Sequence, residues 1–107
     1  MNISPELQQA IEAYCLAHTH EYNKGFEKDI YINCRKQWSY EVKQKFVRVY
    51  SFFPNRIGQS AHCFIQIADE GPYKTGDIFK PASWKAPTKN FIRGNVFTEY
   101  HVSVYGL

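Results

Sequence analysis

The first apolar pattern along the chain repeats every three to four residues, which is the period of an amphipathic helix. Its apolar face carries Leu7, Ile11, Cys15 and His18. The sequence Ser4-Pro5-Glu6 supplies a capping hydroxyl, a proline at the first helical position and an acid near the positive end of the helix dipole. Asn23-Lys24-Gly25 is a typical C-terminal stop. The pattern therefore predicts a helix from about residue 5 to about residue 22.

Two later segments, residues 45–52 and 61–68, alternate in a way that is typical of β-strands. The first segment places on one face Phe46, Arg48, Tyr50 and Phe52, and on the other Val47, Val49 and Ser51. In the second segment the apolar set is Cys63, Ile65 and Ile67, and we expect it to face the core. A turn at residues 54–58 separates the two strands.

Shorter or less regular patterns complete the prediction. Residues 78–80 read as a strand that follows a hairpin loop at 69–77, and residues 29–33 are short and rich in β-formers. Residues 35–45 either extend a strand or form an irregular turn. Residues 96–105 alternate so regularly that we expect a closing strand, or an arm that pairs with a partner.

A helix followed by an antiparallel meander predicts an α+β fold in two layers. We expect the N-terminal amphipathic helix to pack on one face of a sheet of about four strands. The 107 residues are enough for a single core and too few for two, so residues 1–107 form a single domain.

Composition adds an unusually high aromatic content of 17%, which favours sheet and flat contact surfaces. No apolar run approaches the roughly 20 residues that span a bilayer, and no secretion signal is recognisable. The three cysteines, Cys15, Cys34 and Cys63, form no CxxC pair. We therefore expect a soluble, non-secreted protein without membrane contact, whose cysteines are reduced, small buried residues in a cytoplasm.

Charge is unevenly distributed. Residues 1–35 carry three basic and five acidic side chains, whereas residues 36–107 carry ten basic and five acidic ones. This asymmetry favours a polyanionic partner for the second part of the chain. The alternative is a solvated surface on which lysines protect strand edges from aggregation.

The basic residues gather around a tryptophan in a proline-punctuated loop. Within residues 80–93 the chain combines two aromatic rings, Trp84 and Phe91, with Lys80, Lys85, Lys89 and Arg93. Cations bind phosphates, and aromatic faces stack on bases. Three more basic residues on the preceding strand extend this strip, namely Lys43, Lys45 and Arg48. The structural alternative is that Trp84 and Phe91 pack under the helix while the lysines are merely solvated.

The same region carries a resemblance. The sequence from Gly76-Asp77-Ile78 through Lys80-Pro81-Ala82-Ser83-Trp84-Lys85-Ala86-Pro87 to Arg93-Gly94-Asn95 resembles a family of small uncharacterised proteins of tailed phages. Members carry a Gly-Asp-apolar-x-Lys-x-Ala-Ser-Trp-Lys-Ala-Pro block, and the match covers about residues 60–97. Pro81 and Thr88 depart from the family, which usually has Ala at these positions. The resemblance implies a viral origin, and it transfers no catalytic or binding residue to this chain.

The sequence gives little support for a metal site or for a catalytic nucleophile. His18 and His20 are two residues apart on the predicted helix and point in different directions, so they cannot bind one metal ion. His62 and Cys63 are adjacent on a strand and point to opposite faces, so they cannot form a nucleophile–base pair. We expect no enzyme activity, no metal and no cofactor.

The sequence therefore favours a non-enzymatic phage-type accessory protein that binds DNA or RNA in the host cytoplasm. We expect the contacts to be made by Lys43, Lys45, Arg48, Lys80, Trp84, Lys85, Lys89 and Arg93. The alternative is an inhibitor that docks on a host or defence protein, or a minor virion component. An unpaired strand at residues 96–105 would favour that alternative and offers a route to a homodimer.

Overall fold

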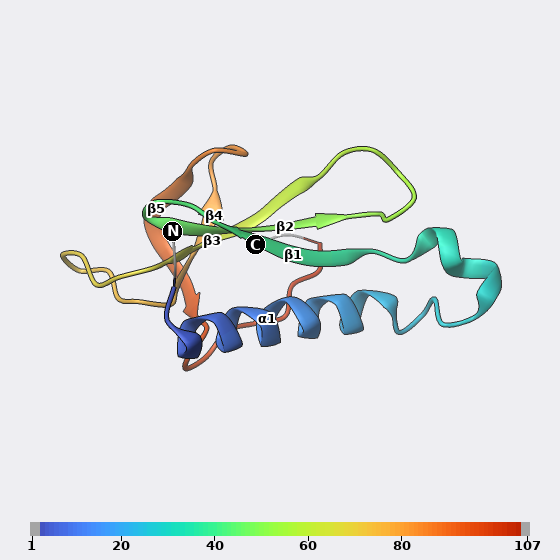
Figure 1. The fold of residues 1–107 in the computed structure, drawn as a ribbon, viewed down its shortest axis with the longest axis horizontal. Helices are drawn as coiled ribbons and strands as arrows, with labels where there is room; N and C mark the ends of the chain where they lie inside the picture. Colours follow the sequence, from blue (N-terminus) through green and yellow to red (C-terminus); the bar gives the residue numbers. More distant parts are fainter. Residues whose placement is uncertain (1–2, 106–107) are drawn as a thin grey trace.

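The computed structural model describes residues 3–105, with the backbone alone for Asn90. Figure 1 shows one long helix beneath a twisted antiparallel sheet. The elements in chain order are α1 (Pro5–Asn23), the 3₁₀-helix η1 (Asp29–Cys34), β1 (Gln37–Val42), β2 (Phe46–Phe52), β3 (Ser60–Gln66), β4 (Asp77–Pro81) and β5 (Pro87–Asn95). The strands follow one another across the sheet in the order β1-β2-β3-β4-β5. The α+β meander is confirmed, with five strands rather than about four.

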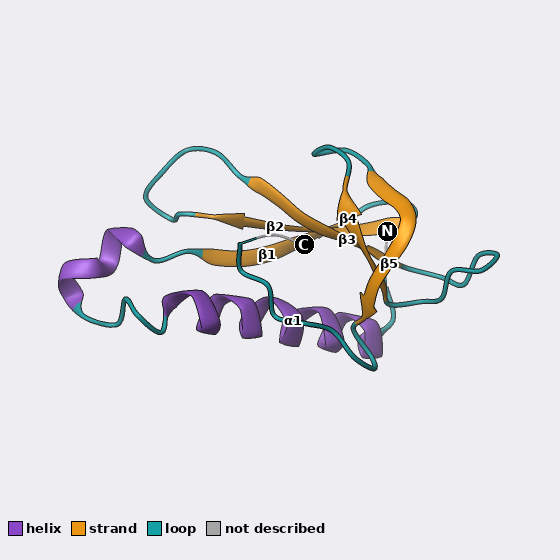
Figure 2. Ribbon diagram, turned by 180° about the vertical axis from the view of Figure 1, so that it is seen from behind, coloured by secondary structure: helices purple, strands orange, loops and turns teal. Residues whose placement is uncertain are grey.

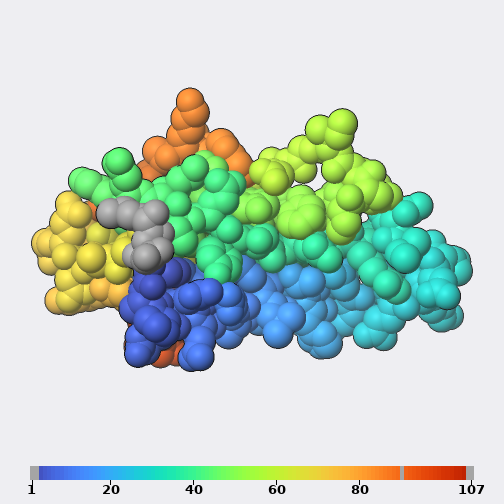
Figure 3. All heavy atoms as spheres, in the orientation of Figure 1, coloured from blue at the N-terminus to red at the C-terminus, as the bar shows by residue number. Residues whose placement is uncertain are grey.

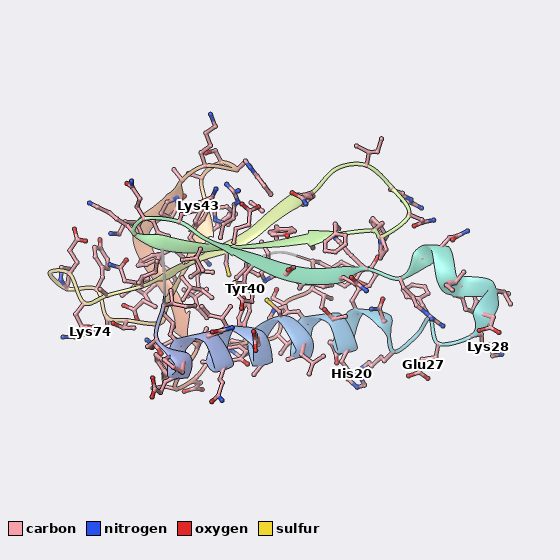
Figure 4. The ribbon with its side chains drawn as sticks, in the orientation of Figure 1. His20, Glu27, Lys28, Tyr40, Lys43 and Lys74 are labelled. Carbon is pink, nitrogen blue, oxygen red and sulfur yellow. The ribbon has the colours of Figure 1, made fainter. Side chains whose placement is uncertain are left out.

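The helix begins and ends where the sequence predicted. The Oγ of Ser4 accepts a hydrogen bond from the backbone N–H of Leu7 at 3.1 Å, and Pro5 occupies the first helical turn. The buried face carries Leu7, Ile11, Tyr14, Cys15 and His18. This face packs on the sheet. Tyr40, which Figure 4 labels on β1, donates a hydrogen bond of 2.9 Å from its hydroxyl to Glu12.

The main core lies between α1 and the lower face of the sheet. Val47 and Val49 of β2 and Cys63 and Ile65 of β3 are fully buried there, so the division predicted for β2 and the core-facing position predicted for Cys63 and Ile65 are confirmed. Trp38 joins them from β1, which lies in the region whose conformation the sequence left open.

A smaller cluster occupies the opposite face of the sheet. Phe64 and Phe79 are buried there, although they point away from the helix. The ring of Phe46 lies 6.2 Å from that of Phe64, and Tyr73 lies 5.3 Å from Phe79. The β4–β5 hairpin curls up over this face (Figure 2), which is why a two-layer domain buries aromatic rings on both faces of its sheet.

The prediction that the chain is a loop beyond Pro81 is wrong in part. Residues 87–95 form β5, and the loop shrinks to residues 82–86. Pro81 and Pro87 face each other next to the loop of this hairpin, where neither has an N–H to donate.

The closing strand predicted at residues 96–105 is also wrong. The backbone N–H of Asn95 bonds to the carbonyl of Glu99 at 2.9 Å, and Thr98 bonds back to Asn95, so the chain turns away from the sheet. It then runs along α1, where Tyr100 lies 4.8 Å from Tyr14. Alternation fails as a guide here because this segment packs against a helix on one side only.

The short strand predicted at residues 29–33 is η1 instead. Its residues are exposed, and no strand of the described chain lies beside them. The Arg35 side chain donates hydrogen bonds of 2.7 and 2.6 Å to the carbonyls of Phe26 and Glu27. These bonds close the connection between α1 and β1 into a compact turn. The segment is held by side-chain hydrogen bonds and not by the backbone hydrogen bonds of a neighbouring strand.

Candidate nucleic-acid interface

The face of the sheet opposite the helix carries an open hollow of about 570 Å³. Its lining comes from the β1–β2 turn, from β2 and from the β4–β5 loop: Lys43, Gln44, Lys45, Phe46, Arg48, Trp84 and Lys85. In Figure 3 the β4–β5 hairpin rises beside the β1–β2 turn, on the side away from α1. Five of the eight residues that the sequence singled out therefore surround one hollow, although they come from segments about 40 residues apart.

Trp84 is half-buried on this outer face. Its ring centroid lies 3.9 Å from the guanidinium carbon of Arg48 and 5.9 Å from the ring of Tyr50. Arg48 Nη1 also donates a hydrogen bond of 3.0 Å to the carbonyl of Trp84. The alternative in which Trp84 packs under the helix is wrong, because Arg48 and Tyr50 lie on the face that points away from α1.

Arg48 is buried, and its charge is compensated inside the protein. Its Nη2 lies 3.0 Å from Glu41 Oε2, and Glu41 also pairs with Lys43 at 3.3 Å. The hydrogen bond from Arg48 is the main cause that lowers the pKa of Glu41. Sequence reasoning missed Glu41, but it lies directly opposite Arg48 in the β1–β2 register. A prediction of β1 as a strand antiparallel to β2 would have placed Glu41 beside Arg48.

The exposed cations of the hollow are three lysines. Lys43 shares Glu41 with Arg48, and Lys45 lies 3.9 Å from Glu70 with both side chains largely in water. Lys85 takes part in none of the ion pairs that join residues 3–105. Exposed ion pairs of this kind are weak, so these ammonium groups can exchange a carboxylate for another anion at little cost.

The other three predicted residues lie outside the lining. Lys89 is half-buried, with its Nζ 4.2 Å from the ring of Tyr73 and 5.0 Å from that of Phe46, so it borders the hollow from the aromatic cluster. Lys80 is exposed on β4. Arg93 is exposed on β5 and stacks on Phe91 at 4.7 Å. Phe91 is itself 60% exposed, so the alternative that buries it under the helix is wrong.

A buried cluster of histidines and a tyrosine lies on the helix side of the sheet, and sequence reasoning missed it. His62 Nε2 lies 3.1 Å from the hydroxyl of Tyr14, and the His18 and His62 rings are 4.7 Å apart. His62 faces α1 together with Cys63 because the β2–β3 register shifts at Val49 and leaves His62 unpaired in a β-bulge. The prediction that His62 and Cys63 point to opposite faces is therefore wrong.

Both histidines of this cluster are neutral. Burial lowers the pKa of His62 to about 3, with the neighbouring His18 as a further cause. Burial also lowers the pKa of His18, whose Nδ1 donates to the carbonyl of Tyr14 at 2.9 Å. His18 Nε2 accepts a hydrogen bond from the backbone N–H of Ser103 at 3.1 Å. The cluster thus fixes the C-terminal segment to α1 only while His18 lacks its second proton.

The cysteines give no sign of nucleophilic chemistry. Cys15 and Cys63 are buried as predicted, whereas Cys34 is exposed, which corrects the expectation for that residue. Burial raises the pKa of Cys15 to about 12 and also raises that of Cys63, which keeps both as thiols. Among residues 3–105, no group of three or more His, Cys, Asp or Glu side chains is placed to hold a metal ion.

None of the helices within residues 3–105 is long and apolar enough to cross a membrane. No curated protein and no solved structure matches the chain. The sequence of residues 2–105 matches a family described as a family of unknown function, DUF7717. Because the match spans nearly the whole chain, the protein belongs to the family DUF7717.

Proposed function

We propose that the protein binds nucleic acid through the hollow beside Trp84, as a non-enzymatic accessory factor of a phage-type genome in the host cytoplasm. One observation carries the proposal. Lys43, Lys45 and Lys85 surround a half-exposed tryptophan on the face of the sheet that the helix leaves open. Ammonium groups displace the counterions of phosphates, and a tryptophan ring offers a stacking surface to a base.

The roles within the site follow from burial. Arg48 is covered and neutralised by Glu41, so we assign it the task of holding Trp84 in place rather than of contacting phosphate. The three exposed lysines bind phosphate oxygens, and the uncovered part of Trp84 contacts a base. Lys80, Lys89 and Arg93 extend the basic surface away from the hollow. The resemblance to tailed-phage proteins supports the place of action in an infected cell.

The first test is fluorescence anisotropy of labelled single- and double-stranded oligonucleotides. Three phosphate contacts predict that affinity falls about 20- to 40-fold between about 50 and about 200 mM salt. The variant Lys43→Ala/Lys45→Ala/Lys85→Ala is expected to lose binding and keep the thermal midpoint of the parent, because the three side chains are exposed.

The matched control is Lys24→Ala/Lys28→Ala/Arg56→Ala. It removes three charges from exposed positions outside the hollow, and Figure 4 shows Lys28 at the end of the molecule remote from Lys43. Equal loss of binding in both variants would show that binding depends on net charge and not on the hollow. Absence of binding at the lower salt would overturn the proposal.

A second candidate is docking on a host protein or in a virion, and a different surface favours it. Ile30 and Ile32 of η1 are 78% and 59% exposed, and Ile57 of the β2–β3 loop is fully exposed. Both segments lie at the same end of the molecule (Figure 1). Exposed apolar side chains gathered at one end are typical of protein contacts. Affinity capture with Ile30→Ser/Ile57→Ser as the comparison tests this candidate.

A further inference from the structure

A second hollow, of about 290 Å³, lies on the helix side of the sheet and shares no residue with the one beside Trp84. It is the more enclosed of the two. The C-terminal end of α1, the residue before β1, the β2–β3 pair and the C-terminal segment supply its polar and aromatic lining: Tyr22, Lys36, Ser51, Ser60, His62 and Tyr105. Its volume is at the lower end of the range of about 300–1,000 Å³ that is usual for small-molecule sites.

Lys36 is the cation of this hollow, and it is held without a counter-ion. Its Nζ lies 5.4 Å from the ring centroid of Tyr22, 5.3 Å from that of Trp38 and 5.4 Å from that of Phe53. It takes part in none of the ion pairs in the described part of the chain. Burial lowers its pKa, which is the sign of a charge that has lost water. An anion would offset that cost.

The position of Lys36 is fixed by its backbone. Asn23 Oδ1 accepts a hydrogen bond of 2.9 Å from the N–H of Lys36, and Asn23 Nδ2 donates one of 2.7 Å to its carbonyl. These bonds join the end of α1 to the start of β1. The three ring contacts then hold the ammonium group on this fixed backbone before any ligand arrives, which lowers the ordering cost of binding.

Neutral donors line the same hollow as this cation. Ser51 and Ser60 face each other in the β2–β3 register, and both hydroxyls can donate to an oxyanion. His62 is a neutral imidazole here, so it adds no competing cation. Tyr22 and the largely exposed Tyr105, whose ring centroids are 6.2 Å apart, supply an aromatic rim.

We propose that this hollow binds a small organic oxyanion, a carboxylate or a phosphate monoester attached to a single planar ring. The ammonium group of Lys36 and the hydroxyls of Ser51 and Ser60 hold the charged end. The ring packs against Tyr22 and Tyr105. The site lies on the opposite side of the sheet from the proposed nucleic-acid interface, so each proposal can fail without the other.

The test is a titration of the intact protein, followed by amide NMR shifts, with benzoate, phenyl phosphate and inorganic phosphate at constant ionic strength. We expect saturable shifts at Lys36, Ser51 and Ser60 with at least one ring-bearing anion. The comparison of benzoate with phenyl phosphate shows whether the hollow prefers a carboxylate or a phosphate. Inorganic phosphate is expected to bind more weakly because it lacks the ring. Shifts that sodium chloride reproduces, or no saturation at millimolar ligand, would overturn the proposal.

Two variants identify the residues. Lys36→Met keeps the apolar stem on the aromatic rings and is expected to weaken binding by about 10-fold or more, since it removes the charge. Lys28→Met is the matched control at an exposed lysine and should bind as the parent does. If Lys36→Met does not fold, Ser60→Ala is the test instead, because Ser60 is exposed and its replacement should leave the fold intact. We expect this variant to bind several-fold more weakly. Parental affinity in either site variant would refute the assignment.

Discussion

At the scale of single residues, Arg48 and Trp84 show how a side chain can be identified correctly and still take a different role. Both were singled out as contacts for nucleic acid. The structure stacks them on each other at 3.9 Å and buries the arginine against Glu41. Sequence alone could not separate a buried arginine from an exposed one, because charge does not report burial.

Trp84→Ala tests the role of this ring. Trp84 is only half-buried, so we expect a loss of about 1–2 kcal/mol in the free energy of unfolding, below the 3–5 kcal/mol of a core tryptophan. Nucleic-acid binding should weaken in the same variant because the stacking surface is gone. Urea unfolding and anisotropy measure the two effects, and Trp38→Ala serves as the core comparison. A loss as large as that of Trp38→Ala would show that Trp84 is a core residue instead.

At the scale of elements, the helix and the strands β2 and β3 could be predicted from the sequence. The last strand of the sheet and the segment that follows it could not. Local periodicity and capping determine α1, and alternation determines β2 and β3. Residues 87–95 carry a mixed pattern, yet they pair with β4 and form β5. Residues 96–105 alternate but turn onto α1, because the hydrogen bonds after Asn95 end the ladder.

Gly76 is the residue that joins these elements, and its replacement is the test at this scale. Its N–H bonds to Gln66 and its carbonyl accepts from Val96, with φ at +92°. A Cβ at this position would lie 2.8 Å from Asn95 Oδ1. We expect Gly76→Ala to cost about 2–4 kcal/mol, from backbone strain and overpacking together.

Gly58→Ala is the control for that variant. Gly58 also has a positive φ, of +110°, but a Cβ there would meet nothing within 4 Å. It should therefore show the strain alone, about 1–2 kcal/mol. Chemical unfolding of both variants gives the difference, which measures the packing of the β3–β4 connection against the segment after β5. Equal losses would contradict the close contact at Gly76.

At the scale of the whole molecule, α1 covers one face of the sheet and the β4–β5 hairpin partly covers the other. The extents of 48 × 25 × 25 Å describe an elongated domain with a hollow on each side of the sheet. The buried histidine cluster fastens three parts of this domain, because it joins α1, β3 and the C-terminal segment.

This cluster makes the stability of the fold depend on pH. In the unfolded chain the two histidines bind protons below about pH 6.5, whereas burial in the native state lowers the pKa of His62 to about 3 and also lowers that of His18. The unfolded state thus binds more protons, and the free energy of unfolding falls as pH falls below about 6.5. His62 alone predicts a loss of about 2 kcal/mol between about pH 7 and about pH 5, and His18 adds to it.

Urea unfolding at both pH values measures this dependence. The carboxylates whose pKa is lowered, Glu41 and Asp69, contribute only at more acidic pH, so this window reports on the histidines. His62→Gln should flatten the dependence, and His20→Gln at the exposed position should leave it unchanged. A parental dependence in His62→Gln would contradict the neutral buried imidazole.

The sequence by itself determined α1, the two faces of β2, the core-facing position of Cys63 and Ile65, the α+β class and the identity of the basic residues around Trp84. These properties depend on neighbouring residues, since capping, periodicity and local charge act over a few positions. Only the tertiary structure decided which strand closes the sheet, that His62 turns inward at a bulge, and that Lys36 lies among three rings. Those outcomes depend on contacts between residues far apart in the chain, whose pairing no local pattern encodes.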